Sequence, residues 1–354
     1  MRILDTLIGK MVIGGALLVL CVLLSLFVFI EFISELDRIG QGDYTAWMAL
    51  KYALFSAPRL AYELMPLAAL LGSLVGLGLL ASNNELVAMR STGVSLARIG
   101  WAAVKAGLLL VVFTVWLGEW VVDAAEEYAA NTRATALAGA GALRTQAGFW
   151  TRDGDSFVSV RAVSDDGELA GIMIYNFDGK GALTRISTAR SATYQGDHWL
   201  LNKVMHNTIS ETLVTAETVP NEEWRSRLDP SVLDVLAVKP GNMSMSGLFR
   251  YIDYLRDNGL DTARYERELW NKLMMPFATA AMVFAALPFV FGSLRSVGIG
   301  QRLLTGVMVG LTFYLVNQAV SYAGLAYGLN PALVGISPTV LLLIVSVLVM
   351  RRVT

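Results

Sequence analysis

The chain has 354 residues, of which 55% are hydrophobic and only 16% are charged, a composition more apolar than that of ordinary soluble domains. This composition predicts a membrane protein and excludes a disordered chain. The net charge of −1 and the lack of any Lys/Arg block argue against nucleic acid as the main partner. The only cysteine, Cys21, lies in an apolar run, so the sequence offers no disulfide scaffold and no thiolate metal site.

Six apolar stretches are long enough to cross a bilayer, for which a helix needs about 20 residues. Leu303–Met350 contains no charged residue and is roughly twice as long as one span requires. We therefore expect two helices there, with the turn between them at Gly324–Pro331. Pro276 and Pro288 are expected to kink the fourth span or to mark its ends. The other four spans are expected at Met11–Ile33, Leu60–Ala81, Ile99–Val122 and Leu273–Leu294.

The distribution of positive charge predicts the orientation of the spans, because short cytoplasmic loops are enriched in Lys and Arg. The short loops of one face hold only Arg38, Lys51 and Arg59, mixed with acidic residues. An even number of spans puts both termini on the same side, so we expect both termini in the cytoplasm. The basic residues that flank the expected cytoplasmic face are Arg2, Lys10, Arg90, Arg98, Arg295, Arg302, Arg351 and Arg352.

The charged segment between the third and fourth spans is predicted to be an antiparallel β-domain, either a sandwich or a jelly roll. Its short runs of β-branched and aromatic residues are bordered by Asp-Gly pairs, which favour tight hairpins. After Pro240–Gly241, residues 246–258 have helical spacing with Gly259 as a C-cap. A polar helix over residues 262–269 is expected to lead back into the membrane. The runs are Phe157–Val163, Gly171–Phe177, Ala189–Tyr194 and His198–Met205.

The predicted fold is an α-helical membrane protein with six transmembrane helices plus an all-β, jellyroll-like extracytoplasmic domain inserted between helices 3 and 4. Residues 1–123 are expected to hold helices 1–3 and a short cytoplasmic helix at about 84–93. Residues 124–270 are expected to form the β-domain with flanking helices, and residues 271–354 to form helices 4–6.

No sequence motif points to catalysis, because the chain has no P-loop, no HExxH and no GxSxG. We expect no cofactor and no metal, and we interpret His198 and His206 as surface or core residues. The only candidate pair for an enzyme acting on lipid is Glu119 with Asp123, at i and i+4. Their position near the end of a span favours a solvated face over an active site.

The loop between the second and third spans carries a candidate coupling helix. Asn84 can cap it, Glu85 lies in its first turn at the positive end of the helix dipole, and Gly93 can end it. A short helix across the cytoplasmic face is what a permease needs to sit in a cleft of a motor subunit. A connector without any partner explains the same pattern equally well.

Basic residues near the outer ends of the spans are candidates for an anionic headgroup. Arg59 and Glu63 lie at i and i+4, so they form either a local ion pair or, with Arg38 and Arg133, a site for phosphate groups. Three small-residue spacings follow the GxxxG pattern, which serves either packing within the chain or a subunit interface. They are Gly72/Gly76, Gly306/Gly310 and Gly324/Gly328.

Several motifs in order along the whole chain resemble the LptF/LptG (YjgP/YjgQ) family of lipopolysaccharide export permeases. Within this family, Gly118–Trp120 and Gly148–Trp150, which precede Asp153–Gly154, favour the LptG branch. Where enteric relatives are lysine-rich, this chain has Glu31 and Asp37. The motifs are Leu64–Gly72, Glu85–Arg90 with Gly93, Gly118–Trp120, and Phe291–Ser296 with Gly300, Arg302, Gly306, Gly310, Phe313 and Tyr314.

The resemblance implies a half-transporter of an ABC exporter without catalytic activity of its own. It would pair with LptF, be driven by a cytoplasmic LptB ATPase dimer, and be joined by LptC, with Met11–Ile33 as a lateral gate. Lipopolysaccharide would leave the outer leaflet of the inner membrane and pass through LptC and LptF to a periplasmic LptA bridge. The residues implied in ATPase coupling are Glu85, Leu86, Met89 and Arg90, and those implied at the headgroup are Arg38, Arg59 and Arg133.

A second hypothesis is a mechanical adaptor that couples a cytoplasmic ATPase to a periplasmic partner without moving lipid. It predicts a β-domain with a closed core and no lipopolysaccharide bound to the purified protein. The export hypothesis predicts bound lipopolysaccharide, because burying acyl chains is favourable by about 0.8 kcal/mol per CH₂ and extraction must therefore be coupled to ATP.

Overall fold

The structure is a computed structural model in which the chain divides into two compact units. One unit comprises Met1–Ile39, Thr45–Ala130 and Glu266–Thr354, and the other comprises Gly40–Tyr44 and Asn131–Tyr265. Gly148, the Pro240–Gly241 boundary and Arg295 lie outside the described residues. The structure describes residues 2–138, 149–154, 156–164, 167–178, 181–210, 213–226, 228, 243–291 and 298–353.

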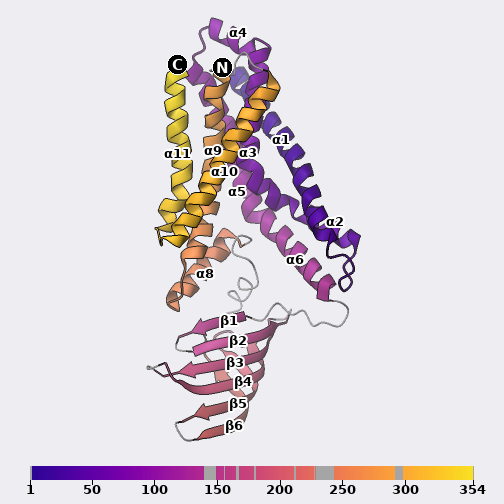
Figure 1. The fold of residues 1–354 in the computed structure, drawn as a ribbon, viewed down its shortest axis with the longest axis vertical. Coiled ribbons are helices and arrows are strands. Elements are labelled where there is room, and N and C mark those ends of the chain that lie inside the picture. The colour runs from indigo at the N-terminus through magenta and orange to yellow at the C-terminus, as the bar shows by residue number, and fades with distance from the viewer. Residues whose placement is uncertain are drawn as a thin grey trace. The chain divides into compact units, whose positions relative to one another are not determined.

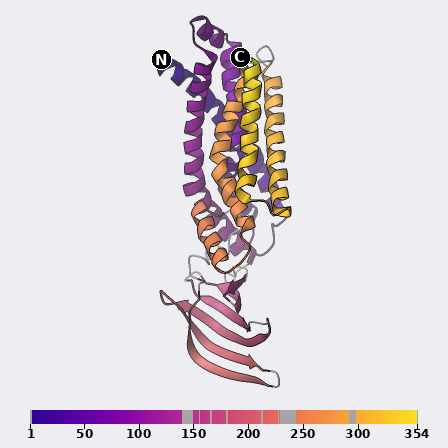
Figure 2. The same ribbon diagram turned by 90° about the vertical axis from the view of Figure 1, so that its left-hand side faces the viewer.

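The first unit is helical and contains the six predicted spans (Figures 1 and 2). Both termini lie at the same end of these helices as the short helix α4, Glu85–Ser91 (Figure 1). Residues 327–330 separate the last two spans, as predicted. The spans are α1 (Arg2–Leu36), α3 (Ala57–Ser82), α5 (Leu96–Trp116) with its continuation, α9 (Ala263–Phe291), α10 (Ile299–Ala326) and α11 (Pro331–Val353).

Two parts of the helical pattern differ from the prediction, and a third agrees with it. The helix of the third span does not end at Val122. Helix α5 continues through a π-helical turn, η1 (Leu117–Val121), into α6 (Val122–Ala138). The sequence of α6 is rich in Ala and contains neither Gly nor Pro, so nothing in it stops the helix. The polar helix over 262–269 leads directly into the fourth span, as predicted, since both lie in the continuous helix α9. Helix α2 (Ala46–Phe55), capped by the Thr45 side chain, was not predicted.

Helices α1 and α3 approach each other so closely that glycine is required where they meet. A Cβ on Gly72 would lie 2.2 Å from the Ala16 nitrogen, and a Cβ on Gly76 would lie 2.2 Å from the Met11 carbonyl oxygen. The small-residue spacing therefore serves packing within this chain. The other predicted pairs also contact side chains of this chain, with Gly306 and Gly310 against leucines of α3 and Gly324 against Val334 of α11.

The second unit contains a six-stranded antiparallel sheet in chain order, β1 to β6. The predicted all-β insert between the third and fourth spans is thus confirmed, as one continuous meander. The first and last strands were not predicted. The strands are β1 (Phe149–Asp153), β2 (Ser156–Val163), β3 (Leu169–Phe177), β4 (Leu183–Tyr194), β5 (Trp199–Ile209) and β6 (Val214–Trp224).

The sheet has a buried apolar core on one face and a cluster of polar side chains around His206. Val158, Ile172 and Trp199 are fully buried in this core, and the Trp199 indole nitrogen donates to the Leu228 carbonyl oxygen at 2.6 Å. His206 lies on the same strand as Trp199. Its Nδ1 is 2.8 Å from the Ser187 hydroxyl, and its Nε2 is 2.8 Å from Glu222 Oε2. His198 lies at the surface beside Asp197, 2.6 Å away.

Helix α8 (Met245–Asp257) packs against the first strand of the sheet within the second unit. The Tyr254 hydroxyl lies 2.6 Å from the Thr151 hydroxyl of β1, and burial raises the pKa of Tyr254. Gly259 has a positive φ of 65° just beyond the helix, as its predicted role in ending the helix requires.

Candidate functional site

Helix α4 connects α3 to α5, at the end of the helical unit that holds both termini (Figure 1). Asn84 precedes it, but with a left-handed φ of 61° and no side-chain cap bond, so the predicted side-chain cap is wrong. A capping side chain needs an extended backbone, whereas Asn tolerates the left-handed region. At the other end, Gly93 has φ 87°. Amide nitrogens of Gly93 and Val94 donate to Arg90 and Met89, which forms a Schellman motif.

The four candidate coupling residues divide between two faces of α4. Leu86 is buried and Met89 packs against the same apolar core of the helical unit. Arg90 is exposed and Glu85 is half-exposed. The helix is therefore fixed by its two apolar side chains while its charged side chains remain accessible. A shallow depression beside it is lined by Ala81, Leu86, Val87, Arg90, Leu96, Ile99, Val290 and Phe291.

The helix ends around α4 are held together by two buried or half-buried cations. Arg98 of α5 donates to both carboxylate oxygens of Asp5 in α1, each at 3.1 Å. Arg302 of α10, only 4% exposed, donates to the Gly78 carbonyl oxygen of α3 at 2.6 Å. The first contact joins α5 to α1, and the second joins α10 to α3.

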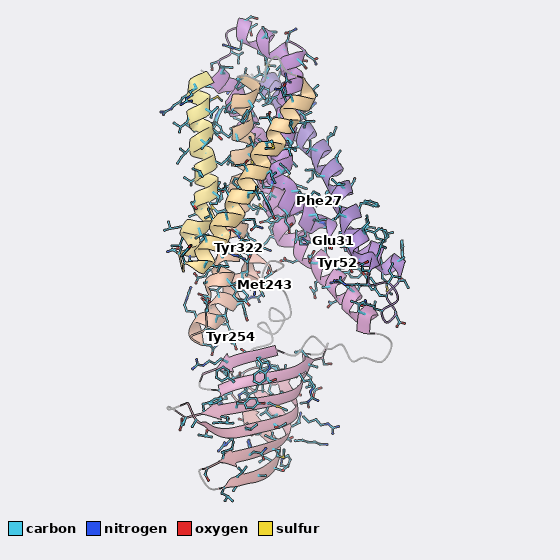
Figure 3. The ribbon with its side chains drawn as sticks, viewed as in Figure 1. Phe27, Glu31, Tyr52, Met243, Tyr254 and Tyr322 are labelled. Atoms are coloured by element: carbon cyan, nitrogen blue, oxygen red, sulfur yellow. The ribbon has the colours of Figure 1, made fainter. Side chains whose placement is uncertain are left out.

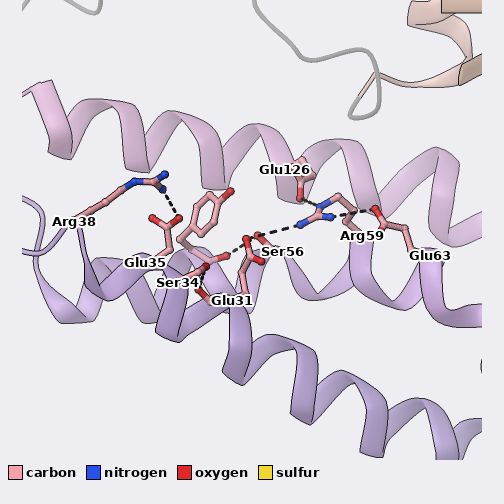
Figure 4. A network of polar contacts seen from close by, with 9 residues as sticks. Glu31, Ser34, Glu35, Arg38, Ser56, Arg59, Glu63 and Glu126 are labelled. Carbon is pink, nitrogen blue, oxygen red and sulfur yellow. Dashed lines mark hydrogen bonds and ion pairs between the residues drawn. The ribbon is translucent and has the colours of Figure 1, made fainter. Parts of the chain in front are cut away.

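At the opposite end of the helical unit, Arg59 is surrounded by carboxylates from three helices (Figure 4). Its Nε donates to Glu126 Oε1 of α6 at 2.8 Å, and its Nη1 donates to Glu63 Oε1 of the same helix at 3.1 Å. Its Nη2 lies 3.9 Å from Glu31 Oε1 of α1, a longer contact. The local ion pair between Arg59 and Glu63 is thus confirmed, and it is one part of a larger cluster.

A second ion pair lies next to this cluster. Arg38 Nη1 is 2.5 Å from Glu35 Oε1, and Glu35 is only 3% exposed. Burial, together with the negative charges of Glu126, Glu31 and Glu35, raises the pKa of the Tyr52 hydroxyl. Figures 3 and 4 show this group of polar side chains at the ends of α1 and α3.

The remaining candidate residues lie on α6 and on the π-helical turn. Arg133 is half-buried on α6, in the second unit. Glu119 and Asp123 are half-buried as well, so the expectation of a solvated face stays a prediction. Lys272 of α9 interacts electrostatically with both carboxylates. The two carboxylates thus face a cation of another helix, as expected for charged groups between membrane helices.

Sequence reasoning missed Glu126 and Glu31 as partners of Arg59. The i, i+4 spacing reveals Glu63, but Glu126 lies 67 residues from Arg59 in the chain. The sequence indicates only that the charged residues within otherwise apolar segments have partners, because an unpaired charge inside the membrane is costly. It does not specify which partner is used.

Comparison with known proteins identifies the family. Residues 7–352 match the family described as lipopolysaccharide export system permease LptF/LptG. The LptG permease of Haemophilus influenzae is 40% identical over 346 residues, covering 97% of this chain and 96% of that protein. The LptG permease of Escherichia coli K12 is 36% identical over 353 residues, covering 99% and 98%. LptF of Escherichia coli K12 is 30% identical over 126 residues, 33% of each chain.

These matches confirm the resemblance inferred from the motifs, including the preference for the LptG branch, since the LptG relatives match over nearly the full length. Six helices capable of spanning a membrane together with this family indicate a multi-pass protein of the inner membrane. The chain belongs to the LptF/LptG family, and it is a transport subunit of a lipopolysaccharide export system, namely one of its permeases.

Proposed function

We propose that this permease subunit extracts lipopolysaccharide from the outer leaflet of the inner membrane and passes it toward a periplasmic bridge. The energy comes from a cytoplasmic LptB ATPase dimer. The observation that carries this proposal is the seating of α4 on helix ends joined by Arg98–Asp5 and Arg302–Gly78, combined with the family match across residues 7–352.

Helix α4 acts as the coupling helix. Leu86 and Met89 fix the helix to the apolar core, so movement of the helix also moves α3 and α5. Glu85 and Arg90 present charges to the ATPase, where charged contacts favour correct docking. This assignment puts both termini and α4 in the cytoplasm and residues 124–270 in the periplasm, in agreement with the Lys/Arg distribution.

The proposed partners are those implied by the family, and the surface of the helical unit supports contacts with other helices. LptF completes a heterodimer, LptC adds its single helix beside α1, and LptA receives the lipid through LptC and LptF. Support comes from α1, whose large apolar side chains remain exposed along its length. Such faces need lipid or another helix as a neighbour. The residues concerned are Leu17, Leu18, Val22, Leu26, Phe29 and Ile30.

Arg59, Arg38 and Arg133 bind the phosphate groups of the headgroup. A guanidinium offers the same planar donors to phosphate as to carboxylate, so a phosphate can replace a carboxylate partner. Glu63 is the partner most open to exchange because its side chain is 51% exposed, whereas that of Glu126 is 10% exposed. Arg59 therefore keeps its contact with Glu126 while Nη1 and Nη2 turn to the ligand.

Replacing Glu85 with Ala tests the coupling role. With LptF, LptB and LptC co-expressed, we expect stimulated ATPase activity and LptB retained on the tagged chain to fall together, by about tenfold, the effect of losing one interfacial charge pair. Ser91→Ala, at an exposed position of the same helix, is the matched control and should leave both unchanged. Wild-type assembly and activity in the Glu85→Ala complex would remove Glu85 from the mechanism.

A further inference from the structure

A line of irregular positions crosses the β-sheet from the second to the sixth strand. Three pairs of opposite residues are missing from the strand pairing, which is regular on both sides of each of them. They are Arg161 and Gly171 between β2 and β3, Arg190 and Gly171 between β3 and β4, and Lys203 and Pro220 between β5 and β6. Between β4 and β5, the ladder is also interrupted at Arg190 and Lys203. Figure 2 shows how strongly the strands curve. We call this line the crease.

Three positions of the crease have an unusual backbone or lack a ladder donor, and the residue type favours this at two of them, Gly171 and Pro220. Gly171 has φ 65° and Lys203 has φ 54°, the left-handed region that side chains with a Cβ rarely adopt. Pro220 has no amide hydrogen to donate to the ladder. A Cβ on Gly171 would lie 2.9 Å from the Arg161 Cβ. Lys203 therefore occupies a strained backbone position, and such positions are enriched at functional sites.

Three cations lie along the crease on one face of the sheet. Arg161, Arg190 and Lys203 are all exposed, and each is the chain neighbour of a residue buried on the other face. Those neighbours are Val160, Ala189 and Val204. Neighbouring strands are about 4.8 Å apart, so the three cations, which span β2 to β5, fit within roughly 15 Å.

No described acidic residue neutralises these three cations. In the part of the chain that the structure describes, none of Arg161, Arg190 and Lys203 makes an ion pair. The polar groups beside them are uncharged, and Asn202 donates to the Ser191 hydroxyl at 3.3 Å. The crease thus combines unpaired cations with hydroxyl and amide groups, a combination suited to phosphate beside sugar hydroxyls.

We propose that the crease binds the phosphate-bearing saccharide of lipopolysaccharide on the face of the β-sheet opposite its buried core. This inference rests on the proposed function only in taking lipopolysaccharide as the cargo. Charge complementarity favours phosphate as the ligand, because each of the three cations can form a charge-assisted hydrogen bond with a phosphate oxygen. An apolar acyl chain can form no such bond.

The test uses the full-length protein in nanodiscs of zwitterionic lipid and a fluorescent probe, the deacylated carbohydrate part of lipopolysaccharide with its phosphates retained. The triple variant Arg161→Gln/Arg190→Gln/Lys203→Gln should bind this probe about tenfold more weakly at low salt, since exposed charge pairs add modest increments. The difference should shrink as salt is raised. Lys203→Arg keeps the charge and should bind as the wild type does.

A matched variant, Arg185→Gln/Arg225→Gln/Arg250→Gln, removes the same charge at exposed positions off the crease and should bind normally. A chemically dephosphorylated probe should bind the wild type and the triple variant equally. Unchanged binding by the triple variant, or an equal loss in the control variant, would overturn the proposal. Unchanged probe binding with weaker assembly would point to an acidic protein partner and also overturn it.

The proposed function would fail in a different measurement. A wild-type complex that neither binds nor exports intact lipopolysaccharide contradicts the export role, whatever the crease does. Normal export combined with unchanged probe binding in the triple variant contradicts only the crease.

Discussion

At the scale of single residues, Arg59 shows how several carboxylates can stabilise one cation at the end of a membrane helix. An isolated charge there is costly, and Glu126, Glu63 and Glu31 offset that cost from three helices. The contacts are unequal, because Glu126 is nearly buried and Glu63 is half-exposed. Under the proposed headgroup role, a phosphate would displace Glu63 and leave the contact between Arg59 and Glu126 in place.

This inequality leads to a prediction about stability. Glu126→Gln should lower the free energy of unfolding by about 2 kcal/mol, because it weakens a buried charge-assisted bond. Glu63→Gln, the matched control on the exposed side, should cost no more than about 1 kcal/mol. Denaturant unfolding in detergent, followed by tryptophan fluorescence, measures both. Equal losses of unfolding free energy in the two variants would mean that burial does not determine how much each contact stabilises the protein.

At the scale of the elements, the crossing of α1 and α3 depends on glycine more than on side-chain interlocking. Backbone atoms of Met11 and Ala16 occupy the space that a Cβ on Gly76 or Gly72 would take. Backbone cannot rotate away as a side chain can, so a methyl group there must separate the helices.

Gly76→Ala should therefore destabilise the protein by about 2 kcal/mol or more, in the range of overpacked cores. Gly14→Ala is the control, since a Cβ at Gly14 of α1 meets nothing within 4 Å, and it should be neutral or slightly stabilising because Ala favours helix. Thermal unfolding of the two purified variants in the same detergent gives the comparison. A Tm for Gly76→Ala equal to that of Gly14→Ala would show that the helices can separate freely.

The elements differ in how far the sequence predicts them. The six spans follow from long uncharged runs, and the four central strands follow from β-branched residues and Asp-Gly turns. Strand β6 contains Pro220 and three glutamates, which disfavour a strand by propensity, and its pairing with β5 overrides them. Helix α2 is too short for a span and was hidden among loop residues.

The candidate site was only half predictable. The position of α4 followed from Glu85 and Gly93, whereas the left-handed Asn84 depends on the path of the chain between α3 and α5. Charged partners such as Arg59 and Glu126 meet only after three helices pack together, and no local spacing encodes that meeting. The crease was likewise invisible, since Arg161, Arg190 and Lys203 become neighbours only through strand register.

At the scale of the whole molecule, the chain joins two parts with different chemistry. The helical unit carries α4 at one end and the Arg59 cluster at the other (Figures 1 and 4), and α3 runs between them. Helix α3 thus connects α4 to the Arg59 cluster as one continuous, closely packed helix. The β-unit has one buried apolar face, and the crease with its exposed cations lies on the other face.

The central claim is that this chain carries lipopolysaccharide under the drive of a partner ATPase. The most direct measurement is to purify the tagged protein from its native host in mild detergent and to quantify all co-purifying proteins and lipids by mass spectrometry. We expect LptF, LptB and lipopolysaccharide together, with LptB present at two copies per tagged chain. An ATPase that co-purifies without lipopolysaccharide would contradict the extraction role and support the mechanical adaptor, and the absence of both would contradict the export function altogether.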